Sequence, residues 1–311
     1  MNEFDYIDKY FRPLTNKFAM NLKNDAAIFN QKSTSDLIIS TDTLAEGIHF
    51  FGNENPIDIA EKSLRVNLSD MAAMGAKPIF YNLALSIPKI KASQFIPKFT
   101  KGLQDDQGTF DIKLIGGDLT SSLKHINITI TIFGKTSSGK SISRDGAKIG
   151  ECLYVSGILG LSKIGLDNFN SKLKEFKEAK RKYLLPEPRV DLGISLINIA
   201  TSMIDISDGL VQDATHLAKN SNLTVELNLC KIPLPNIKQI KKELTLKSAL
   251  YGGDDYELLF SCNTSHENLV EELSKKFNLK LTKIGIFKKF KNNFLEFKNN
   301  NFKPNNSYLH F

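Results

Sequence analysis

Carboxylate side chains recur at the ends of the elements that the apolar pattern of this chain predicts. Five short motifs carry them, each where an apolar run stops or a glycine turn begins: Asn24-Asp25, Ser40-Thr41-Asp42, Asn67-Leu68-Ser69-Asp70, Gly117-Asp118 and Asp205-Ile206-Ser207-Asp208. Carboxylate oxygens are preferred ligands of hard cations such as Mg²⁺. A nucleoside triphosphate is itself an anion, so metal ions would have to lie between it and these aspartates. The motifs therefore predict a site for several Mg²⁺ ions and a polyphosphate.

Ordinary structural roles explain two of these motifs poorly. Asp208 could cap a helix that begins at Leu210, but capping leaves Asp205, at the end of an apolar strand, without a role. Asp70 lies inside a helical segment, where burying an unpaired carboxylate is costly. Arg65 lies five residues before Asp70 and would not face it on a helix. A bound metal is the favoured compensation for Asp70.

One motif favours a different nucleotide site. Residues Gly134 to Ser141 match the GxxxxGK[ST] pattern of a P-loop NTPase. That loop binds phosphate where it leads directly into a helix, whose first amides face the ligand. The sequence after Ser141 contains Gly146 and Gly150 and shows no apolar stripe at helical spacing. We therefore interpret the segment as a hairpin tip and keep the P-loop as an alternative.

The apolar periodicity predicts an α/β chain with two units. We expect strands over residues 36–40, 78–87, 112–115, 127–135, 152–156, 203–206, 258–261 and 279–287. We expect helices over 3–11, 56–74, 93–107, 159–183, 188–200, 210–220 and 266–277. The polar, Gly-rich stretch 134–150 predicts a boundary between an N-terminal domain, 1–140, and a C-terminal domain, 141–311.

Composition excludes several classes of protein. The chain has 311 residues, 41% of them hydrophobic and 24% charged, which is typical of a globular protein. The charged first thirty residues do not resemble a signal peptide, and no run is long enough to span a bilayer. Its three cysteines show neither a CxxC pair nor a zinc pattern. We expect a cytoplasmic protein with no membrane partner.

The net charge of +7 raises the question of nucleic-acid binding. Much of the excess lies in residues 172–182, where glutamates alternate with lysines at helical spacing, and in the Lys- and Asn-rich residues 275–303. Neither segment contains an RNA-binding motif, so both are interpreted as solvated surface and no nucleic-acid partner is predicted. A basic RNA-binding or scaffold protein is the alternative of another class, and it would bind nucleic acid with a steep salt dependence.

The motifs taken together resemble one family. They are, in chain order, Asp25-Ala26-Ala27, Ser40-Thr41-Asp42-Thr43-Leu44, His49-Phe50, the run from Asn67 to Ala76, Gly116-Gly117-Asp118, Ser143-Arg144, Ile204 to Leu210, and Gly252 to Leu258. Over nearly the whole chain they resemble thiamine-monophosphate kinase. The resemblance implies the α/β (α+β) two-domain fold shared with aminoimidazole ribonucleotide synthetase and selenophosphate synthetase. It also implies an N-terminal α/β domain that pairs across a homodimer, beside a C-terminal α/β domain, with ATP bound in the cleft.

The same resemblance implies an activity and a set of site residues. The activity is ATP-dependent phosphorylation of thiamine phosphate to thiamine diphosphate with several Mg²⁺ ions. Implied Mg²⁺ ligands are Asp25, Ser40, Thr41, Asp42, Asp70, Asp118, Asp205 and Asp208. Implied ATP contacts are Gly117, Asp118, Arg144 and Ser207, and implied thiamine phosphate contacts are His49, Asp254 and Tyr308. Asp70, Asp208 and Arg144 are the expected catalytic residues.

The chain departs from the family pattern at two positions. Asn24 stands where the family usually has an acid, which removes one negative charge from the first metal position. Asp254 stands where the family often has the longer Glu, and Tyr308 matches only by its place near the end of the chain. Another ATP-using enzyme of the same superfamily is the alternative activity. Selenophosphate synthesis would require a reactive cysteine near the N-terminus, but the first cysteine is Cys152.

Overall fold

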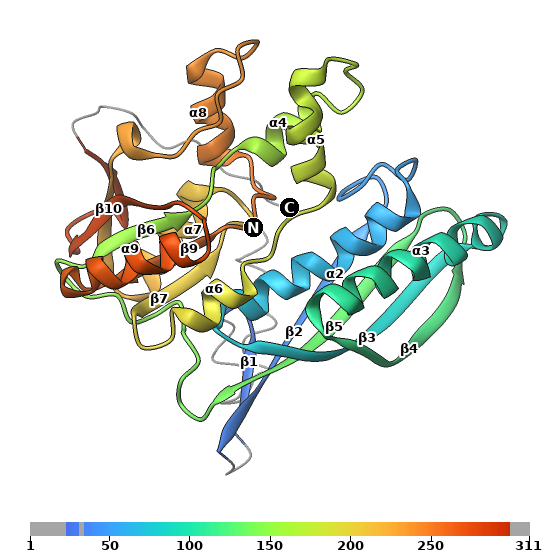
Figure 1. The fold of residues 1–311 in the computed structure, drawn as a ribbon, viewed down its shortest axis with the longest axis horizontal. Helices are drawn as coiled ribbons and strands as arrows, with labels where there is room; N and C mark the ends of the chain where they lie inside the picture. The colour runs from blue at the N-terminus through green and yellow to red at the C-terminus, as the bar shows by residue number, and fades with distance from the viewer. Residues whose placement is uncertain (1–22, 31–33, 299–311) are drawn as a thin grey trace.

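The computed structural model describes residues 23–30 and 34–298. The helix predicted over 3–11 and the predicted substrate contact Tyr308 lie outside these residues. The described strands form two sheets, one from the first half of the chain and one from the second (Figure 1). None of the described helices combines the length and apolar character that a bilayer span requires.

The N-terminal sheet has five strands in the order β1-β2-β5-β3-β4. Their bounds are β1 Ala27–Asn30, β2 Ser35–Ala45, β3 Lys77–Pro88, β4 Lys113–Ser122 and β5 Asn127–Ser137. Neighbouring strands are antiparallel except for β3 and β4, which are parallel. The predicted strands are confirmed, and all four are longer than predicted, β2 and β4 by the most. β2 continues past Thr41-Asp42 to Ala45, and Gly116-Gly117-Asp118 lies inside β4 and not in a turn.

Two long helices, α2 Pro56–Ala73 and α3 Lys89–Phe110, lie side by side on one face of this sheet (Figure 1). The side chain of Asn55 accepts a hydrogen bond from the Ile57 amide, and Pro56 occupies the first helical turn, so α2 begins where the sequence predicts. Alternate residues of β2 and β5, among them Ile38, Leu44 and Ile130, are buried beneath these helices.

The opposite face of the N-terminal sheet is polar and exposed. The Thr41 and Thr131 hydroxyls lie 3.0 Å apart on it, and the Thr43 and Thr129 hydroxyls lie 2.8 Å apart. At the edge of the sheet, every residue of β4 except Ser122 is exposed. Within the described chain, this edge strand therefore has hydrogen-bonding groups and side chains available to another surface.

The C-terminal sheet has six strands in the order β11-β8-β10-β6-β9-β7. Their bounds are β6 Cys152–Ser156, β7 Ala200–Asp205, β8 Leu223–Leu227, β9 Leu258–Cys262, β10 Leu281–Lys289 and β11 Leu295–Phe297. The pairs are antiparallel except β8 and β11. Sequence periodicity missed β8, and it missed β1 and β11, which are too short to show a clear period.

Helices pack on both faces of this second sheet, with α7 Leu210–Asn220 and α8 Lys242–Tyr251 on one face and α9 Glu267–Lys276 on the other. The helices α4 Leu161–Asp167 and α5 Lys177–Leu184 pack mainly against each other, and α6 Val190–Ser195 packs against α2. Turns of 3-10 helix lie at Lys174–Phe176, Leu229–Lys231 and Thr264–His266. Along β6, Leu153 and Val155 join the core beneath α7 and α8, whereas Cys152 and Tyr154 join the core that continues to α2. The prediction missed α8 and treated α4 and α5 as one helix.

Residues 138–151 connect the two sheets through turns and bends. The strand β5 precedes Ser138, but no helix follows Ser141 in this segment, so the residues that match the P-loop pattern do not lead into a helix. The Lys140 ammonium instead donates to the Asn198 side chain at 2.9 Å on the surface. The placement of the domain boundary in this region stays a prediction.

Candidate active site

A cavity of about 370 Å³ lies where the two sheets and α2 meet. Segments that are far apart in the chain line it: the chain before β1, β2, α2, the link around Arg144, and the loop after β7. Predicted site residues that line the cavity are Asp25, Ser40, Thr41, Asp42, His49, Asp70, Arg144, Asp205, Ser207, Asp208 and Asp254. The cavity therefore brings together most of the residues that sequence reasoning selected.

The strand β2 presents Ser40 and Asp42 on one face because side chains alternate along a strand. The Ser40 hydroxyl contacts the Asp70 carboxylate and lies 2.9 Å from the Asp25 carbonyl oxygen. The Thr41 side chain points to the other face, where it bonds Thr131. If Thr41 is a metal ligand, as predicted, it must therefore coordinate the ion through its backbone carbonyl.

Three carboxylates form the centre of the site. Oxygens of Asp25, Asp70 and Asp205 all lie within 4.8 Å of one another. Burial, reinforced by repulsion from neighbouring aspartates, raises the pKa of Asp70 well above its ordinary value and that of Asp205 to about 8. The same two causes raise the pKa of Asp42 to about 6. These acids were brought together at an electrostatic cost, which a bound cation would offset.

Asp205 ends β7 and Asp208 lies in the turn before α7, as predicted. Asp205 is buried and accepts a hydrogen bond of 2.6 Å from Ser69 of α2, and Asp208 accepts one of 2.8 Å from Gln212. Asp205 is the last residue of β7, so the strand carries its carboxylate directly to the cavity. Neither aspartate acts as the side-chain cap of α7, so the capping role considered for Asp208 is not observed.

Arg144 is the cation that faces this cluster. Its guanidinium bonds both oxygens of the Asp25 carboxylate, with Nε 2.9 Å from Oδ2. Burial alone would lower the pKa of Arg144, but attraction to Asp25 outweighs burial and raises it. The side-chain oxygen of Asn24, which also lines the cavity, accepts a 2.9 Å bond from the Arg144 backbone amide. The residue that replaces the family's usual acid therefore helps to place Arg144.

Residues 23–136 match the family model described as AIR synthase related protein, N-terminal domain. Thiamine-monophosphate kinase from Buchnera aphidicola subsp. Schizaphis graminum is 39% identical over 294 residues, which cover 91% of this chain and 90% of that protein. The chain belongs to the thiamine-monophosphate kinase family.

Solved structures agree with this assignment. The structure of AaThiL complexed with AMPPCP and TMP has a TM-score of 0.88 and 28% identity, covering all of this chain and 97% of that one. Thiamine-monophosphate kinase from Stenotrophomonas maltophilia K279a has a TM-score of 0.81 and 31% identity, covering 95% and 96%. The predicted two-domain α/β fold of the family is therefore confirmed.

Two predicted nucleotide contacts of the thiamine-monophosphate kinase family lie away from the cavity within one chain. Gly117 and Asp118 lie on the exposed edge strand β4. A Cβ added to Gly117 would lie 1.8 Å from the Leu83 carbonyl oxygen, so the close approach of β3 already requires glycine there. The roles of Gly117 and Asp118 stay predictions, and they depend on what covers β4.

Sequence reasoning missed four residues that lie at or next to this candidate site. Asp213 and His216 line the cavity from α7, Tyr256 lines it beside Asp254, and the ammonium of Lys62 reaches Asp254 from α2. Asp213 accepts bonds of 3.3 and 3.2 Å from the amides of residues 208 and 209 and so holds the turn in place. Burial, together with repulsion from the neighbouring Arg144, lowers the pKa of His216 to about 4.

Signals for these residues were present in the sequence. Asp213 and His216 are three residues apart in the helix that opens directly after the Asp205 motif, so they share its cavity-facing side. Lys62 interrupts the apolar stripe of α2 between Ile59 and Val66, where a charged side chain must find a partner.

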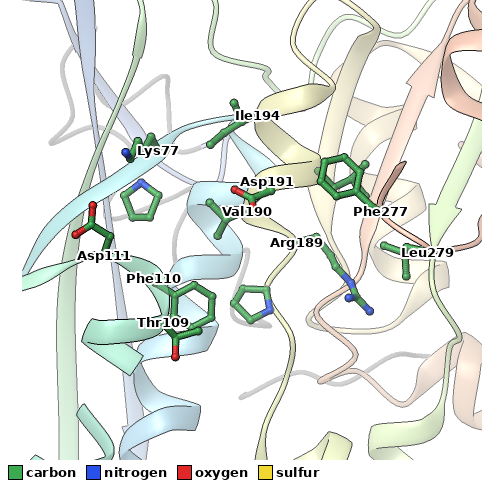
Figure 2. A pocket seen from close by; sticks show the side chains of 13 residues that line it. Lys77, Thr109, Phe110, Asp111, Arg189, Val190, Asp191, Ile194, Phe277 and Leu279 are labelled. Carbon is green, nitrogen blue, oxygen red and sulfur yellow. The ribbon is translucent and has the colours of Figure 1, made fainter. Parts of the chain in front are cut away.

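A second, larger hollow of about 570 Å³ lies between the two halves of the molecule (Figure 2). Figure 2 shows Lys77 and Phe110 from the N-terminal half facing Arg189 and Phe277 from the C-terminal half. None of the predicted site residues lines it, and Arg189 is already paired with the buried Glu257 at 2.6 Å. The smaller acidic cavity, and not this hollow, is the candidate active site.

Proposed function

We propose that this chain, as a member of the thiamine-monophosphate kinase family, transfers the γ-phosphoryl group of ATP to thiamine phosphate and forms thiamine diphosphate. The observation that carries the proposal is the meeting of Asp25, Asp70 and Asp205 within 4.8 Å beside Arg144. The relatives that cover more than 90% of this chain carry the name of this activity. A structural neighbour of TM-score 0.88 is complexed with AMPPCP and TMP.

The donor set fits divalent cations. Asp25, Asp42, Asp70, Asp205 and Asp208 offer hard oxygen ligands, and their mutual repulsion is relieved when cations neutralise them. We propose that these five residues, with the hydroxyl of Ser40 and the carbonyl of Thr41, hold several Mg²⁺ ions. When bound, Mg²⁺ would neutralise phosphate charge and orient the two phosphates.

The chain's own residues then align and stabilise the reactants. An ionised phosphate oxygen of thiamine phosphate attacks the γ-phosphorus as the bond from that phosphorus to the bridging oxygen of ADP breaks. A phosphate monoester is largely ionised near neutral pH, so this step requires no general base. Arg144, held by Asp25, still has N–H groups that can donate to the transferring phosphoryl group. We place the nucleotide near Arg144 and Ser207, and the acceptor near His49 and Asp254.

We also propose that the working form is a homodimer that covers β4. Leu119 is 62% exposed and Leu123 is fully exposed at the edge of the N-terminal sheet, where Leu114 and Ile115 are exposed as well. An uncovered apolar edge strand readily pairs with another chain, and a second copy is the simplest partner. A dimer would also bring Gly117 and Asp118 of β4 to a shared surface, where they could contact nucleotide.

A direct assay tests the proposed function. The purified chain is incubated with Mg-ATP and thiamine phosphate, and the products are measured by mass. We expect thiamine diphosphate and ADP in equal amounts. ATP hydrolysis without thiamine diphosphate would indicate another activity of the superfamily. Cytoplasmic location and the lack of a nucleic-acid partner stay predictions from composition.

A further inference from the structure

Lys62 is a buried lysine of α2 whose side chain is only 4% exposed. Its neighbours on the same stripe of α2, Ile59, Ser63 and Val66, are buried as well. A charged ammonium in such a place requires several polar contacts to offset the loss of water. Lys62 finds them in three segments that come from both halves of the chain.

The first contact of Lys62 is Asp254. Lys62 Nζ lies 2.9 Å from Asp254 Oδ2, and the Tyr256 hydroxyl donates to Asp254 Oδ1 at 3.2 Å. Both carboxylate oxygens are therefore held, although the Asp254 side chain is 33% exposed and lines the acidic cavity. A carboxylate whose two oxygens are both hydrogen-bonded keeps one orientation toward a ligand.

The backbone around Asp254 connects this contact to residues 206–208, the turn that carries the proposed metal ligand Asp208. Asp254 and Tyr256 have φ angles of 59° and 49°, a left-handed conformation that is unfavourable for residues with a side chain. Their amides donate to the carbonyls of Ser207 and Ile206, each at 2.8 Å. Such a conformation persists only where its surroundings hold it, and Lys62 is the side-chain cation that does so from the other domain.

The second contact of Lys62 is the segment that carries His49. Lys62 Nζ donates to the His49 carbonyl at 3.3 Å, and the Tyr183 hydroxyl donates to the same oxygen at 3.2 Å. The ammonium also lies 3.9 Å from the centre of the Tyr183 ring. Tyr183 packs against Phe51 and Phe169, with ring centres 6.4 and 5.9 Å away. Lys62 thus joins the two predicted acceptor contacts, His49 and Asp254, through one ammonium group.

We infer that Lys62 is a positioning residue for the phosphate acceptor, because it holds Asp254 and the His49 backbone in one arrangement across the two domains. The inference rests on the proposed function, which places thiamine phosphate near these two residues. Lys62 acts through Asp254 and His49 and belongs to neither the metal cluster nor the nucleotide side. Its loss should therefore weaken acceptor binding selectively.

The matched comparison is Lys182, a second lysine that pairs with a buried carboxylate. Lys182 Nζ lies 3.1 Å from Glu257 Oε1, with side chains 11% and 1% exposed. This pair faces a different hollow from the acidic cavity. Substituting either lysine removes an ammonium from a carboxylate, but Glu257 keeps Arg189 at 2.6 Å, so both variants should lose stability and Lys182→Met should lose less.

The test measures KM for each substrate in the Lys62→Met and Lys182→Met variants. We expect Lys62→Met to raise KM for thiamine phosphate by roughly tenfold or more while KM for ATP stays within about twofold, as for loss of acceptor binding alone. Lys182→Met should lower the thermal midpoint but leave both KM values near those of the wild type. Lys62→Arg should recover part of the acceptor affinity, because it restores a cation.

A double-mutant cycle with Asp254→Asn tests whether Lys62 affects thiamine phosphate binding through Asp254. If Lys62 acts through Asp254, Lys62→Met should raise KM for thiamine phosphate much less in the Asp254→Asn background than in the wild type. The inference would be overturned by parallel rises in both KM values or by an unchanged KM for thiamine phosphate. It would also be overturned by the same pattern in Lys182→Met or by fully additive effects in the cycle. A wild-type chain that forms no thiamine diphosphate would instead overturn the proposed function, and this inference with it.

Discussion

The Ser69 hydroxyl donates a 2.6 Å hydrogen bond to the Asp205 carboxylate, which lies 136 positions later in the chain. Ser69 comes from α2 and Asp205 from the end of β7, so this bond connects the N-terminal helix layer to the C-terminal sheet at the centre of the acidic cavity. Both side chains are buried. The cation-binding cluster therefore depends on the packing of the two halves of the chain.

Replacing Asp70 with Asn should abolish turnover without unfolding the chain. The substitution keeps the side-chain shape but removes a charge from the centre of the cluster, so metal and ATP should bind poorly. We expect kcat to fall by about a thousandfold or more. Product formation and circular dichroism measure the two effects, and Asp167→Asn, at an exposed residue paired with Lys163, is the control. Near-normal turnover in Asp70→Asn would remove the metal assignment.

Replacing Asp205 with Asn should stabilise the metal-free protein at neutral and higher pH. Burial, with repulsion from Asp25, raises the pKa of Asp205 from 3.8 to about 8, so folding favours its protonated form. Ionising Asp205 therefore destabilises the folded wild type. This loss of stability is absent below about pH 4 and grows until the pH passes about 8. With chelator present, we expect the variant to melt about 5 °C or more above the wild type at pH 8.

The difference in melting temperature should shrink steadily as the pH falls from 8 toward 4, because Asp205 becomes protonated. Thermal unfolding followed by circular dichroism at several pH values measures it. Added Mg²⁺ should raise the melting temperature of the wild type more than that of Asp205→Asn. A constant difference across this pH range would show that Asp205 does not titrate as its surroundings imply.

Replacing Lys140 with Ala should leave activity nearly unchanged, although Lys140 occupies the lysine position of the P-loop pattern. In the structure, this lysine bonds Asn198 on the surface and does not line the acidic cavity. We expect kcat/KM for ATP within about twofold of the wild type, as for an exposed substitution far from the site. A loss of a hundredfold would favour the P-loop alternative. Arg144→Ala is the positive control and should lose most activity.

Replacing Leu119 with Lys should separate the proposed dimer. Leu119 is 62% exposed on β4, and a lysine on an edge strand opposes pairing with another strand. We expect a shift from dimer to monomer in analytical ultracentrifugation, with loss of activity. Leu269→Lys, at another exposed leucine on α9, should leave the dimer intact. A wild-type chain that sediments as a monomer at working concentration would contradict the dimer proposal.

Mixing two inactive variants tests whether Asp118 acts across that dimer. If each site uses Asp70 of one copy and Asp118 of the other, a mixed dimer of Asp70→Asn and Asp118→Asn contains one intact site. Equal, fully exchanged mixtures should then recover about a quarter of wild-type activity, because half of the dimers are mixed and half of their sites are intact. Recovery near zero would place both residues in the same copy's site.

The sequence by itself determined the local parts of this protein. Pro56 and the apolar spacing that follows predicted α2, and the alternation after Asn127 predicted β5, because each pattern depends only on neighbouring residues. The motifs around Asp42, Asp70 and Asp205 identified carboxylates whose chemistry suits metal and phosphate, and the structure places all three at one cavity. Short-range patterns carry this information without any knowledge of the fold.

Only the tertiary structure decided how these parts meet. The direction of the Thr41 side chain follows from the register of β2 against β5, and the exposure of Asp118 follows from the place of β4 at the edge of the sheet. The bond from Lys62 to Asp254 joins residues 192 positions apart, and no local periodicity records such a distance. These relationships arise when helices and sheets pack to bury apolar surface, so they depend on the whole chain at once.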